Sequence, residues 1–108
     1  MSWTVETLND VVDEELTALP ADMLARFHYI GQLIQEFGLQ RVREPHVKHI
    51  HGSIWEMRLH GKGGISRALY VTATGQRVVV VRAFVKKTQK TPKREIELAL
   101  ERAKEILP

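Results

Sequence analysis

Hydrophobic residues in the first forty positions are spaced as in a short strand followed by two helices. Residues 3–8 (WTVETL) alternate apolar and polar side chains, which is typical of an edge strand. Asn9 or Asp10 can cap a short helix, and Pro20 suits the first turn of a second helix that Gly38 ends. This second helix carries one continuous apolar stripe, which we predict to be core: Met23, Phe27, Ile30, Ile34 and Phe37.

The pattern changes to a period of two in the second half of the chain. Three segments predict successive antiparallel strands joined by glycine-containing turns: residues 53–61, 65–74 and 77–87. A basic, histidine-rich connector, residues 39–52, precedes them. After them, Thr91 can act as the N-cap of a final helix and Pro92 as its first residue. Residues 1–108 therefore form a single α+β domain, in which two N-terminal helices and one C-terminal helix pack on a small antiparallel sheet.

Alternation along residues 53–61 sorts their side chains into two sets. The apolar set should face the core: Trp55, Met57 and Leu59. The polar set should face away from the core together: Glu56, Arg58 and His60. Because Arg58 and His60 share this outward face, it is a candidate surface for binding an anion.

Charge is segregated along the chain, although the formal net charge is only +3. Residues 1–40 hold one basic residue against seven acidic ones, whereas residues 41–94 hold thirteen basic residues against two acidic ones. Such a block is typical of a face that meets a polyanion, and nucleic acid is the leading candidate. The alternative is a basic surface that only keeps the protein in solution.

Composition and motifs exclude several other classes of protein. The chain has no cysteine, which excludes disulfides, thiolate zinc sites and cysteine nucleophiles. The N-terminus lacks a signal-peptide pattern and no segment is apolar enough to span a bilayer, so we expect a cytoplasmic protein without membrane contact. His49 and His51 could chelate a metal with nearby His46, but no carboxylate follows at a recognisable spacing. We therefore expect no metal and no cofactor.

Hairpin geometry should bring basic side chains from separate strands onto one face of the sheet. Arg58 and His60 lie on the first predicted strand, Arg67 on the second, and Lys86 and Lys87 at the end of the third. Such a cluster can hold a phosphate and stabilise the charge that develops on it, without a metal. Arg67 stands within an otherwise apolar strand, where a charge requires a partner.

Several motifs resemble the HigB-like branch of the RelE/ParE toxin superfamily, over essentially the whole chain. FVKKTQKTP before the last helix is the most specific of them, and REPHVK and the WEMR strand motif are supporting matches. The resemblance implies a RelE-like fold and the toxin of a type II toxin–antitoxin system. It also implies a small helix-turn-helix, HigA-like antitoxin as partner, and it allows a heterotetramer with that antitoxin.

The activity implied by the resemblance is that of an mRNA interferase, a metal-independent endoribonuclease that cuts translated messenger RNA on the ribosome. The ribose 2′-hydroxyl attacks the adjacent phosphate and leaves a 2′,3′-cyclic phosphate. By motif, Arg67 and Lys87 are expected at the scissile phosphate, with Arg58 as a charge stabiliser or proton carrier and His60 as a fourth catalytic candidate. The expected RNA-binding lysines are Lys48, Lys86, Lys90 and Lys93.

Two departures from the RelE pattern leave the general base open. Glu56 stands where the strand motif has a lysine, and the last helix contains no tyrosine. His60 and Glu56 are therefore both candidates for the base. Two rival functions also stay open, a ParE-like poison of DNA gyrase and a non-catalytic basic module that binds nucleic acid.

Overall fold

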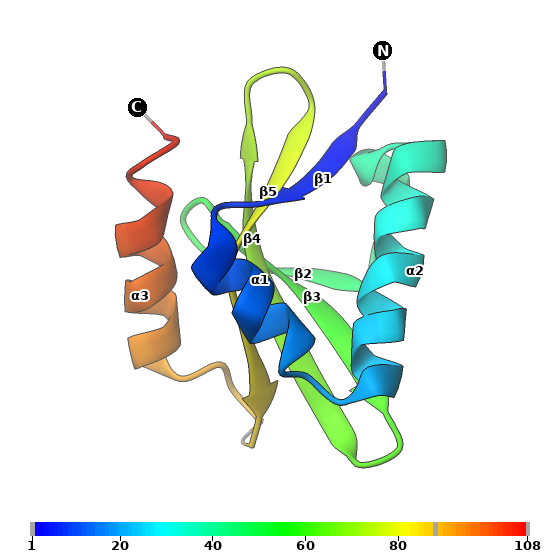
Figure 1. Ribbon diagram of the computed structural model, residues 1–108. Helices are drawn as coiled ribbons and strands as arrows, with labels where there is room; N and C mark the ends of the chain where they lie inside the picture. Colours follow the sequence, from blue (N-terminus) through cyan, green and yellow to red (C-terminus); the bar gives the residue numbers. More distant parts are fainter. Residues whose placement is uncertain (1, 88, 108) are drawn as a thin grey trace.

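A five-stranded sheet lies between helices in the computed structural model (Figure 1). The structure describes residues 2–87 and 89–107. The elements of the described residues are, in chain order, β1 (Thr4–Thr7), α1 (Asp10–Thr17), α2 (Ala21–Phe37), the 3₁₀ helix η1 (Leu39–Arg41), β2 (Val47–His51), β3 (Ile54–Gly61), β4 (Gly64–Ala73), β5 (Arg77–Lys86) and α3 (Lys93–Ala103). The α+β class predicted from the sequence is confirmed, with two helices before the main strands and one after them.

The sheet is antiparallel except at one edge. Its strand order is β1-β5-β4-β3-β2, and β1 pairs with β5 in parallel, through residues 77–80. The predicted edge strand at residues 3–8 is thus confirmed as β1. All four valines at 78–81 are buried, as expected for a strand covered on both faces.

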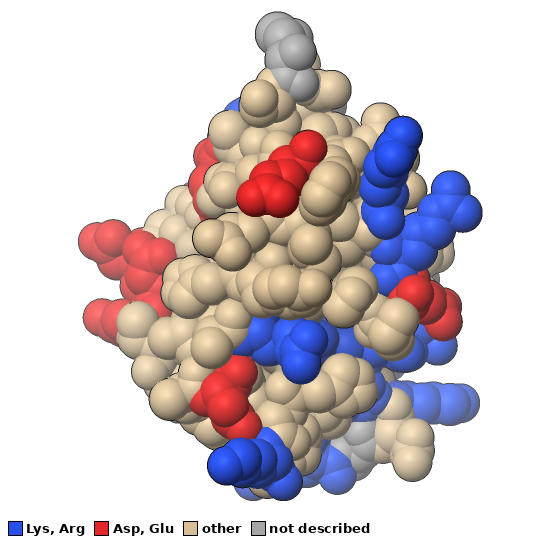
Figure 2. Space-filling model, turned by 90° about the vertical axis from the view of Figure 1, so that its right-hand side faces the viewer, with Lys and Arg blue, Asp and Glu red and all other residues tan. Residues whose placement is uncertain are grey.

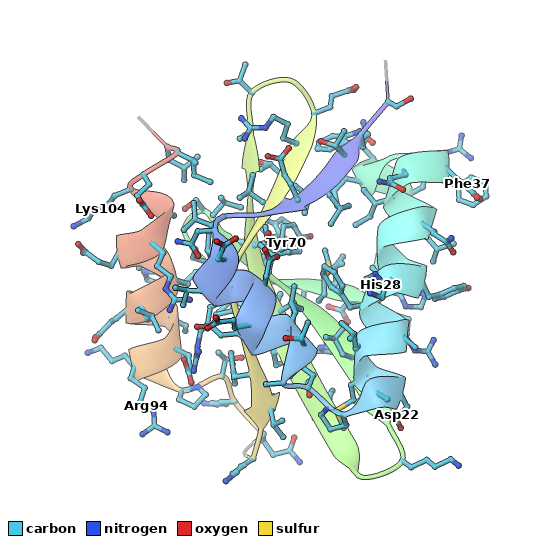
Figure 3. The ribbon with its side chains drawn as sticks, in the orientation of Figure 1. Asp22, His28, Phe37, Tyr70, Arg94 and Lys104 are labelled. Carbon is cyan, nitrogen blue, oxygen red and sulfur yellow. The ribbon has the colours of Figure 1, made fainter. Side chains whose placement is uncertain are left out.

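Side-chain alternation divides the core between the two faces of the sheet. On one face, α1 and α2 pack against strand residues such as Met57 and Tyr70. On the opposite face, α3 packs through Ala99 and Ala103 against residues such as Leu69. Small alanine side chains let α3 lie close to the strands. Figure 3 shows Tyr70 at the centre of the molecule, between the helices of the two layers.

Side chains cover the part of β5 that extends beyond β1. The backbone N–H of Ala83 donates to Glu15 Oε1 at 3.1 Å, and Arg102 Nη1 donates to the carbonyl of Val81 at 2.8 Å. Glu15 also forms ion pairs with Arg82 at 2.9 Å and with Arg102 at 2.8 Å. One carboxylate therefore ties α1, β5 and α3 together, and the strand edge presents fewer open backbone groups.

The predicted caps at the start of α1 and at the end of α2 are confirmed. The Asn9 side chain accepts a hydrogen bond from the N–H of Val12 at 3.1 Å. Gly38 ends α2 with a φ of 86°, a conformation that glycine adopts without strain, and its N–H donates to Ile34 O at 2.8 Å.

Four local predictions were wrong. Trp55, predicted in the core, is 39% exposed, since it lies opposite His49 of the edge strand β2. Residues 47–51 of the predicted connector form β2, because Val47 is buried and the segment pairs with β3. Phe37 is 56% exposed, since it is the last residue of α2 and points away from the sheet (Figure 3). Thr91 does not cap α3; Pro92 precedes its first residue, and the Thr91 hydroxyl donates to Glu56 instead.

No helix in the described part of the chain is both long and apolar enough to cross a lipid bilayer.

Candidate functional site

The register of β3, β4 and β5 places three basic side chains on one face of the sheet. Arg58 on β3 lies directly opposite Arg67 on β4, and Lys86 on β5 lies opposite Ile65. This is the face on which α3 packs, but α3 covers the other end of the strands. The convergence expected from hairpin geometry therefore occurs for Arg58, Arg67 and Lys86.

Glu56 forms the centre of this cluster. Its side chain is 2% exposed, and its Oε1 accepts a hydrogen bond from Arg67 Nη1. Arg58 Nε lies 3.6 Å from the same oxygen, and the Thr91 hydroxyl donates to Oε2 at 2.6 Å. A carboxylate can be buried here because each of its oxygens has a donor. We call Glu56, Arg58, Arg67 and Lys86 the Glu56 cluster.

The positive charges of the cluster outnumber its single carboxylate. Burial lowers the pKa of Arg67, the negative charge of Glu56 opposes this shift, and the neighbouring charge of Arg58 adds to it. Burial also lowers the pKa of Lys86, and the charges of Arg67, Arg58 and Lys48 lower it further against the pull of Glu56. Cations that repel one another in this way favour the binding of an additional anion.

Two donors in the cluster have no hydrogen-bond acceptor among the described residues. Arg58 Nε and Arg67 Nε are both buried and donate no hydrogen bond there, although Arg58 Nε lies 3.6 Å from Glu56 Oε1 and Arg67 binds Glu56 through Nη1. Buried guanidinium nitrogens without an acceptor are costly, and an anionic oxygen would satisfy them. The Arg58 side chain is 23% exposed, so a phosphate can approach the two arginines from its side.

The remaining predicted residues surround the cluster or lie apart from it. Lys48 is exposed on β2, opposite Glu56. His60 is exposed near the end of β3, on the same face as Arg58. The structure does not bring Lys87 into the cluster, because β5 ends at Lys86 and the Lys87 side chain is exposed beyond it.

The last two predicted lysines lie beyond β5. Lys90 is exposed in the segment that joins β5 to α3. Lys93 is the first residue of α3 and forms an ion pair with Glu97 at 3.8 Å.

Basic side chains also gather outside the cluster. Figure 2 views the molecule from the side of α2 and shows Lys and Arg collected toward the lower and right-hand parts of that face, with acidic side chains prominent on the left. The charge segregation along the sequence thus persists on the surface, which favours a polyanion as ligand.

Sequence reasoning missed the roles of Glu56 and Thr91. It placed Glu56 on a solvent-facing surface, but the second face of the sheet is also covered, by α3 and the segment before it. It assigned Thr91 to a helix cap. One signal was available, because Arg67 required a partner and Glu56 is one of only two acidic residues between positions 41 and 94.

The described residues contain no group of three histidine, aspartate or glutamate side chains that could hold a metal ion. His49 and His51 do not share a site. His49 Nε2 lies 2.7 Å from Gly52 O, and the register of β2 shifts between the two histidines.

Comparison with known proteins places this site in a family. Residues 14–104 match the model of the family described as "Phage derived protein Gp49-like (DUF891)". Two curated relatives, each named "Probable endoribonuclease HigB1" and from two strains of Mycobacterium tuberculosis, are 39% identical over 72 residues. These residues are 67% of this chain and 57% of each relative, so the matched part spans little more than half the length of those proteins. The family match covers both helical layers and all the residues of the Glu56 cluster, and the chain belongs to the Gp49-like family.

Proposed function

We propose that this protein is the toxin of a type II toxin–antitoxin system and that it is an endoribonuclease. The name of its M. tuberculosis relatives supports an endoribonuclease of the HigB kind. The observation that carries the proposal is the Glu56 cluster, in which two buried arginine nitrogens lack an acceptor among the described residues. An RNA phosphate would neutralise the excess positive charge and accept hydrogen bonds from the guanidinium groups.

The reaction we propose is attack of the ribose 2′-oxygen on the adjacent phosphorus. The new bond joins the 2′-oxygen to phosphorus, and the bond between phosphorus and the 5′-oxygen of the next nucleotide breaks. The products are a 2′,3′-cyclic phosphate and a free 5′-hydroxyl. One group must accept the 2′-hydroxyl proton, and another must donate a proton to the departing 5′-oxygen.

The Glu56 cluster supplies groups for these tasks. We assign Arg58 and Arg67 to the phosphate oxygens, where negative charge develops. Lys86 is a proton donor at the 5′-oxygen, because its lowered pKa makes its proton easier to release. Lys87, exposed beside Lys86, stays proposed at the scissile phosphate. The general base is His60 or Glu56, and the exposed His60 is the more accessible of the two, because both oxygens of Glu56 already accept hydrogen bonds.

The partners proposed for this function are a HigA-like, helix-turn-helix antitoxin and the ribosome with its messenger RNA. Exposed lysines around the cluster are positioned to contact an RNA backbone: Lys48, Lys90 and Lys93. Contacts of this type bind any sequence, so choice of a cleavage site would come from other contacts or from the ribosome.

Purified protein added to a translating extract tests the proposal. We expect cleavage within the translated part of the message, with a 2′,3′-cyclic phosphate on the upstream fragment and a 5′-hydroxyl on the downstream one. The same protein added to free message measures the need for the ribosome. An intact message together with blocked DNA supercoiling would instead indicate a gyrase poison, and binding without either effect would indicate a non-catalytic module.

A further inference from the structure

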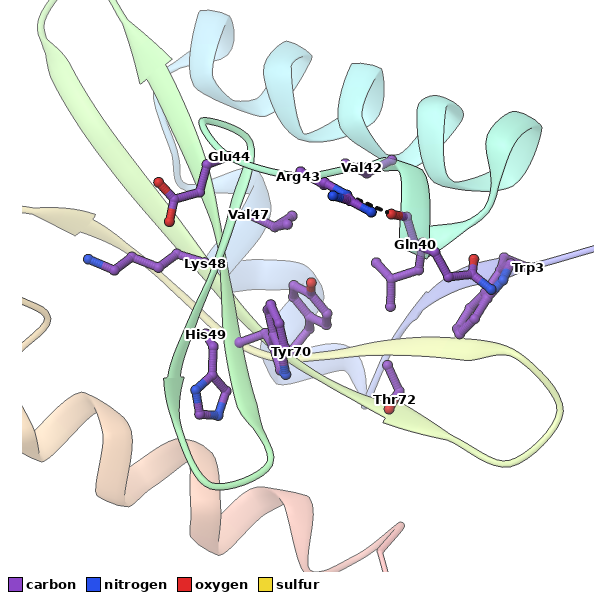
Figure 4. Close-up of a pocket in the computed structure, with 12 residues that line it drawn as sticks. Trp3, Gln40, Val42, Arg43, Glu44, Val47, Lys48, His49, Tyr70 and Thr72 are labelled. Atoms are coloured by element: carbon purple, nitrogen blue, oxygen red, sulfur yellow. Dashed lines mark hydrogen bonds between the residues drawn. The ribbon is translucent and has the colours of Figure 1, made fainter.

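A second candidate site lies on the other side of the sheet from the Glu56 cluster. It is a pocket of about 670 Å³ between η1, β2, β3 and β4, next to the N-terminal segment (Figure 4). Its volume falls in the range of pockets that hold small organic ligands. Six of the residues that line it are apolar or aromatic: Trp3, Leu39, Val42, Val47, Trp55 and Tyr70.

Aromatic rings form much of the pocket. Trp3 and Trp55 are the two tryptophans of the chain, and both line it. Trp55 is 39% exposed although it is large and apolar, and the His49 ring lies beside it at 5.1 Å between ring centroids. Exposed aromatic faces of this kind bind the flat faces of nucleobases. The exposed part of Trp55 therefore offers a stacking surface in the pocket.

Tyr70 adds an unsatisfied polar group to the same pocket. Its side chain is 1% exposed, and its hydroxyl is buried without a hydrogen-bond partner among the described residues. A buried hydroxyl usually has a partner.

Three of the six polar residues that line the pocket are basic. Arg43, Lys48 and His49 line it, together with a single acidic residue, Glu44. Arg43 is held in place by a hydrogen bond from its Nε to Gln40 O at 3.2 Å, which Figure 4 shows as a dashed line. A cation next to a stacking surface suits a ligand that combines a base with a phosphate.

Lys48 connects this pocket with the Glu56 cluster. It lines the pocket, it lies opposite Glu56 in the pairing of β2 with β3, and its charge acts on Lys86. Trp55 and Glu56 are neighbours on β3, so their side chains point to opposite faces of the sheet. Because β2 is the edge strand, an extended RNA chain can pass around it from one face to the other.

We propose that this pocket binds a nucleobase of single-stranded RNA, a few nucleotides away from the phosphate that the Glu56 cluster holds. The inference rests on the proposed function, since it names a second contact for the same RNA. The base stacks on Trp55, and Lys48 contacts the backbone that links the pocket to the cluster.

Tryptophan fluorescence tests this directly, because both tryptophans line the pocket. The probe is a 2′-O-methyl RNA trinucleotide, which cannot be cleaved because its 2′-oxygen is blocked. The matched control is the same trinucleotide with an abasic central residue. We expect saturable quenching by the first and binding at least about tenfold weaker by the second, as loss of one base–aromatic stack predicts.

Substitutions in the pocket test whether the trinucleotide binds there. Trp55→Ala and Lys48→Ala should each weaken binding of the labelled trinucleotide, measured by anisotropy, by about tenfold. Phe37→Ala removes an exposed aromatic ring outside the pocket and should leave binding unchanged. Circular dichroism spectra that match the parent protein establish that the variants are folded.

Three results separate this inference from the proposed function. Base-dependent quenching by a protein that cleaves no RNA would support the pocket and overturn the endoribonuclease. Cleavage of RNA together with equal binding of the complete and abasic trinucleotides would overturn the pocket alone. Shielding of both tryptophans by a co-purified protein partner, with no quenching by RNA, would also overturn it and assign the pocket to that partner.

Discussion

At position 56, one buried carboxylate balances several neighbouring cations. Removing a single cation should therefore reduce the electrostatic repulsion within the cluster, provided that the carboxylate keeps another partner. Glu56 keeps Arg67 and Thr91 if the charge of Lys86 is lost. The direction of the pKa shift of Lys86 agrees with this expectation. A lysine whose pKa is lowered on folding destabilises the folded state at neutral pH. That cost declines as the pH rises through the lowered pKa toward 10.5, the value of an unperturbed lysine.

We predict that Lys86→Met stabilises the protein while it impairs RNA cleavage. The free energy of unfolding at pH 7 should rise by about 0.5–1 kcal/mol, because relief of the repulsion and of the buried charge outweighs loss of the hydrogen bond from Lys86 Nζ to Gln89 O. Lys87→Met is the matched control, since Lys87 is exposed and its replacement should change stability by no more than about 0.5 kcal/mol. Urea unfolding measures both. A Lys86→Met variant that is less stable than the parent would contradict the view that Lys86 is strained.

Single residues also show what the sequence can and cannot predict about the site. Arg67 was identified because a charge within an apolar strand needs a partner. Its partner was not identified, because alternation alone cannot tell whether the second face of a strand meets solvent or another helix. Glu56 is covered in part by Thr91, in the segment before α3, which lies more than thirty residues further along the chain.

At the scale of elements, the β3–β4 hairpin is attached to the start of α2 by one side chain. Asp22 Oδ2 accepts a hydrogen bond from the N–H of Lys62 at 2.7 Å. Figure 3 shows Asp22 at the N-terminal end of α2, beside this hairpin. A β-carbon added at Gly61 would lie 2.6–2.8 Å from the Asp22 carboxylate, so this contact requires glycine.

We expect Gly61→Ala to lower the melting temperature. The Asp22 side chain must move away and lose its hydrogen bond to the turn, at a cost of about 1 kcal/mol. Gly63→Ala is the matched control in the same turn, since an added β-carbon there meets no atom within 4 Å. In an Asp22→Ala background the effect of Gly61→Ala should largely disappear, and an unchanged effect would count against the contact.

Glu15 performs a similar role between α1, β5 and α3. Burial alone would raise the pKa of its carboxyl, but hydrogen bonds from Arg102 and the Ala83 N–H and the nearby arginine charges lower it. The folded state therefore binds this proton less tightly than the unfolded state does. The resulting stability is fully present above about pH 4.5 and is lost as the pH falls through the lowered pKa.

We predict that Glu15→Gln lowers the free energy of unfolding at pH 7 by about 1.5–3 kcal/mol, because charged hydrogen bonds are lost. The variant should also lose less stability than the parent between pH 5 and pH 3. Glu14→Gln, one position earlier and exposed, serves as the control. Equal pH dependence in the parent and in Glu15→Gln would show that another group causes the acid sensitivity.

The elements themselves were mostly predictable, because their hydrophobic periods are clear. β2 was the exception. Its five residues contain Val47 and Ile50 among lysine and histidines, so its apolar pattern is too short to distinguish it from a loop. Its pairing with β3 supplies the missing information, and that contact is not local in the sequence.

At the scale of the whole molecule, the segregated charge predicts how binding responds to salt. Each lysine that contacts an RNA phosphate releases a bound cation from the RNA, so the affinity falls as salt rises. The acidic first forty residues do not remove this effect, because basic side chains still gather on one part of the surface (Figure 2).

We predict that Lys87→Ala weakens binding of single-stranded RNA and reduces the slope of log affinity against log salt by about 0.7. Lys104→Ala is the control. It removes an equally exposed lysine at the far end of α3, where Lys104 pairs with Glu101 at 2.9 Å. Anisotropy titrations across a range of salt concentrations provide both slopes, and equal losses in the two variants would mean that binding is not localised.

The overall charge pattern suggested a polyanion from the sequence alone, but it did not locate the contact surface. The pairing of β3, β4 and β5 places Arg58, Arg67 and Lys86 together, and Thr91, before α3, contacts Glu56 among them. The central claim is that this cluster cleaves RNA.

Single-turnover cleavage of a ribosome-bound message by Arg67→Lys tests that claim most directly. A lysine at position 67 keeps the positive charge beside Glu56. Its single nitrogen cannot contact Glu56 and a phosphate together, as the planar guanidinium of arginine can. Arg77→Lys is the control, since Arg77 pairs with Glu6 at 2.9 Å at the other end of β5. We predict a loss of about a hundredfold or more for Arg67→Lys and a normal rate for Arg77→Lys. A folded Arg67→Lys variant that cleaves at the parent rate would contradict the account.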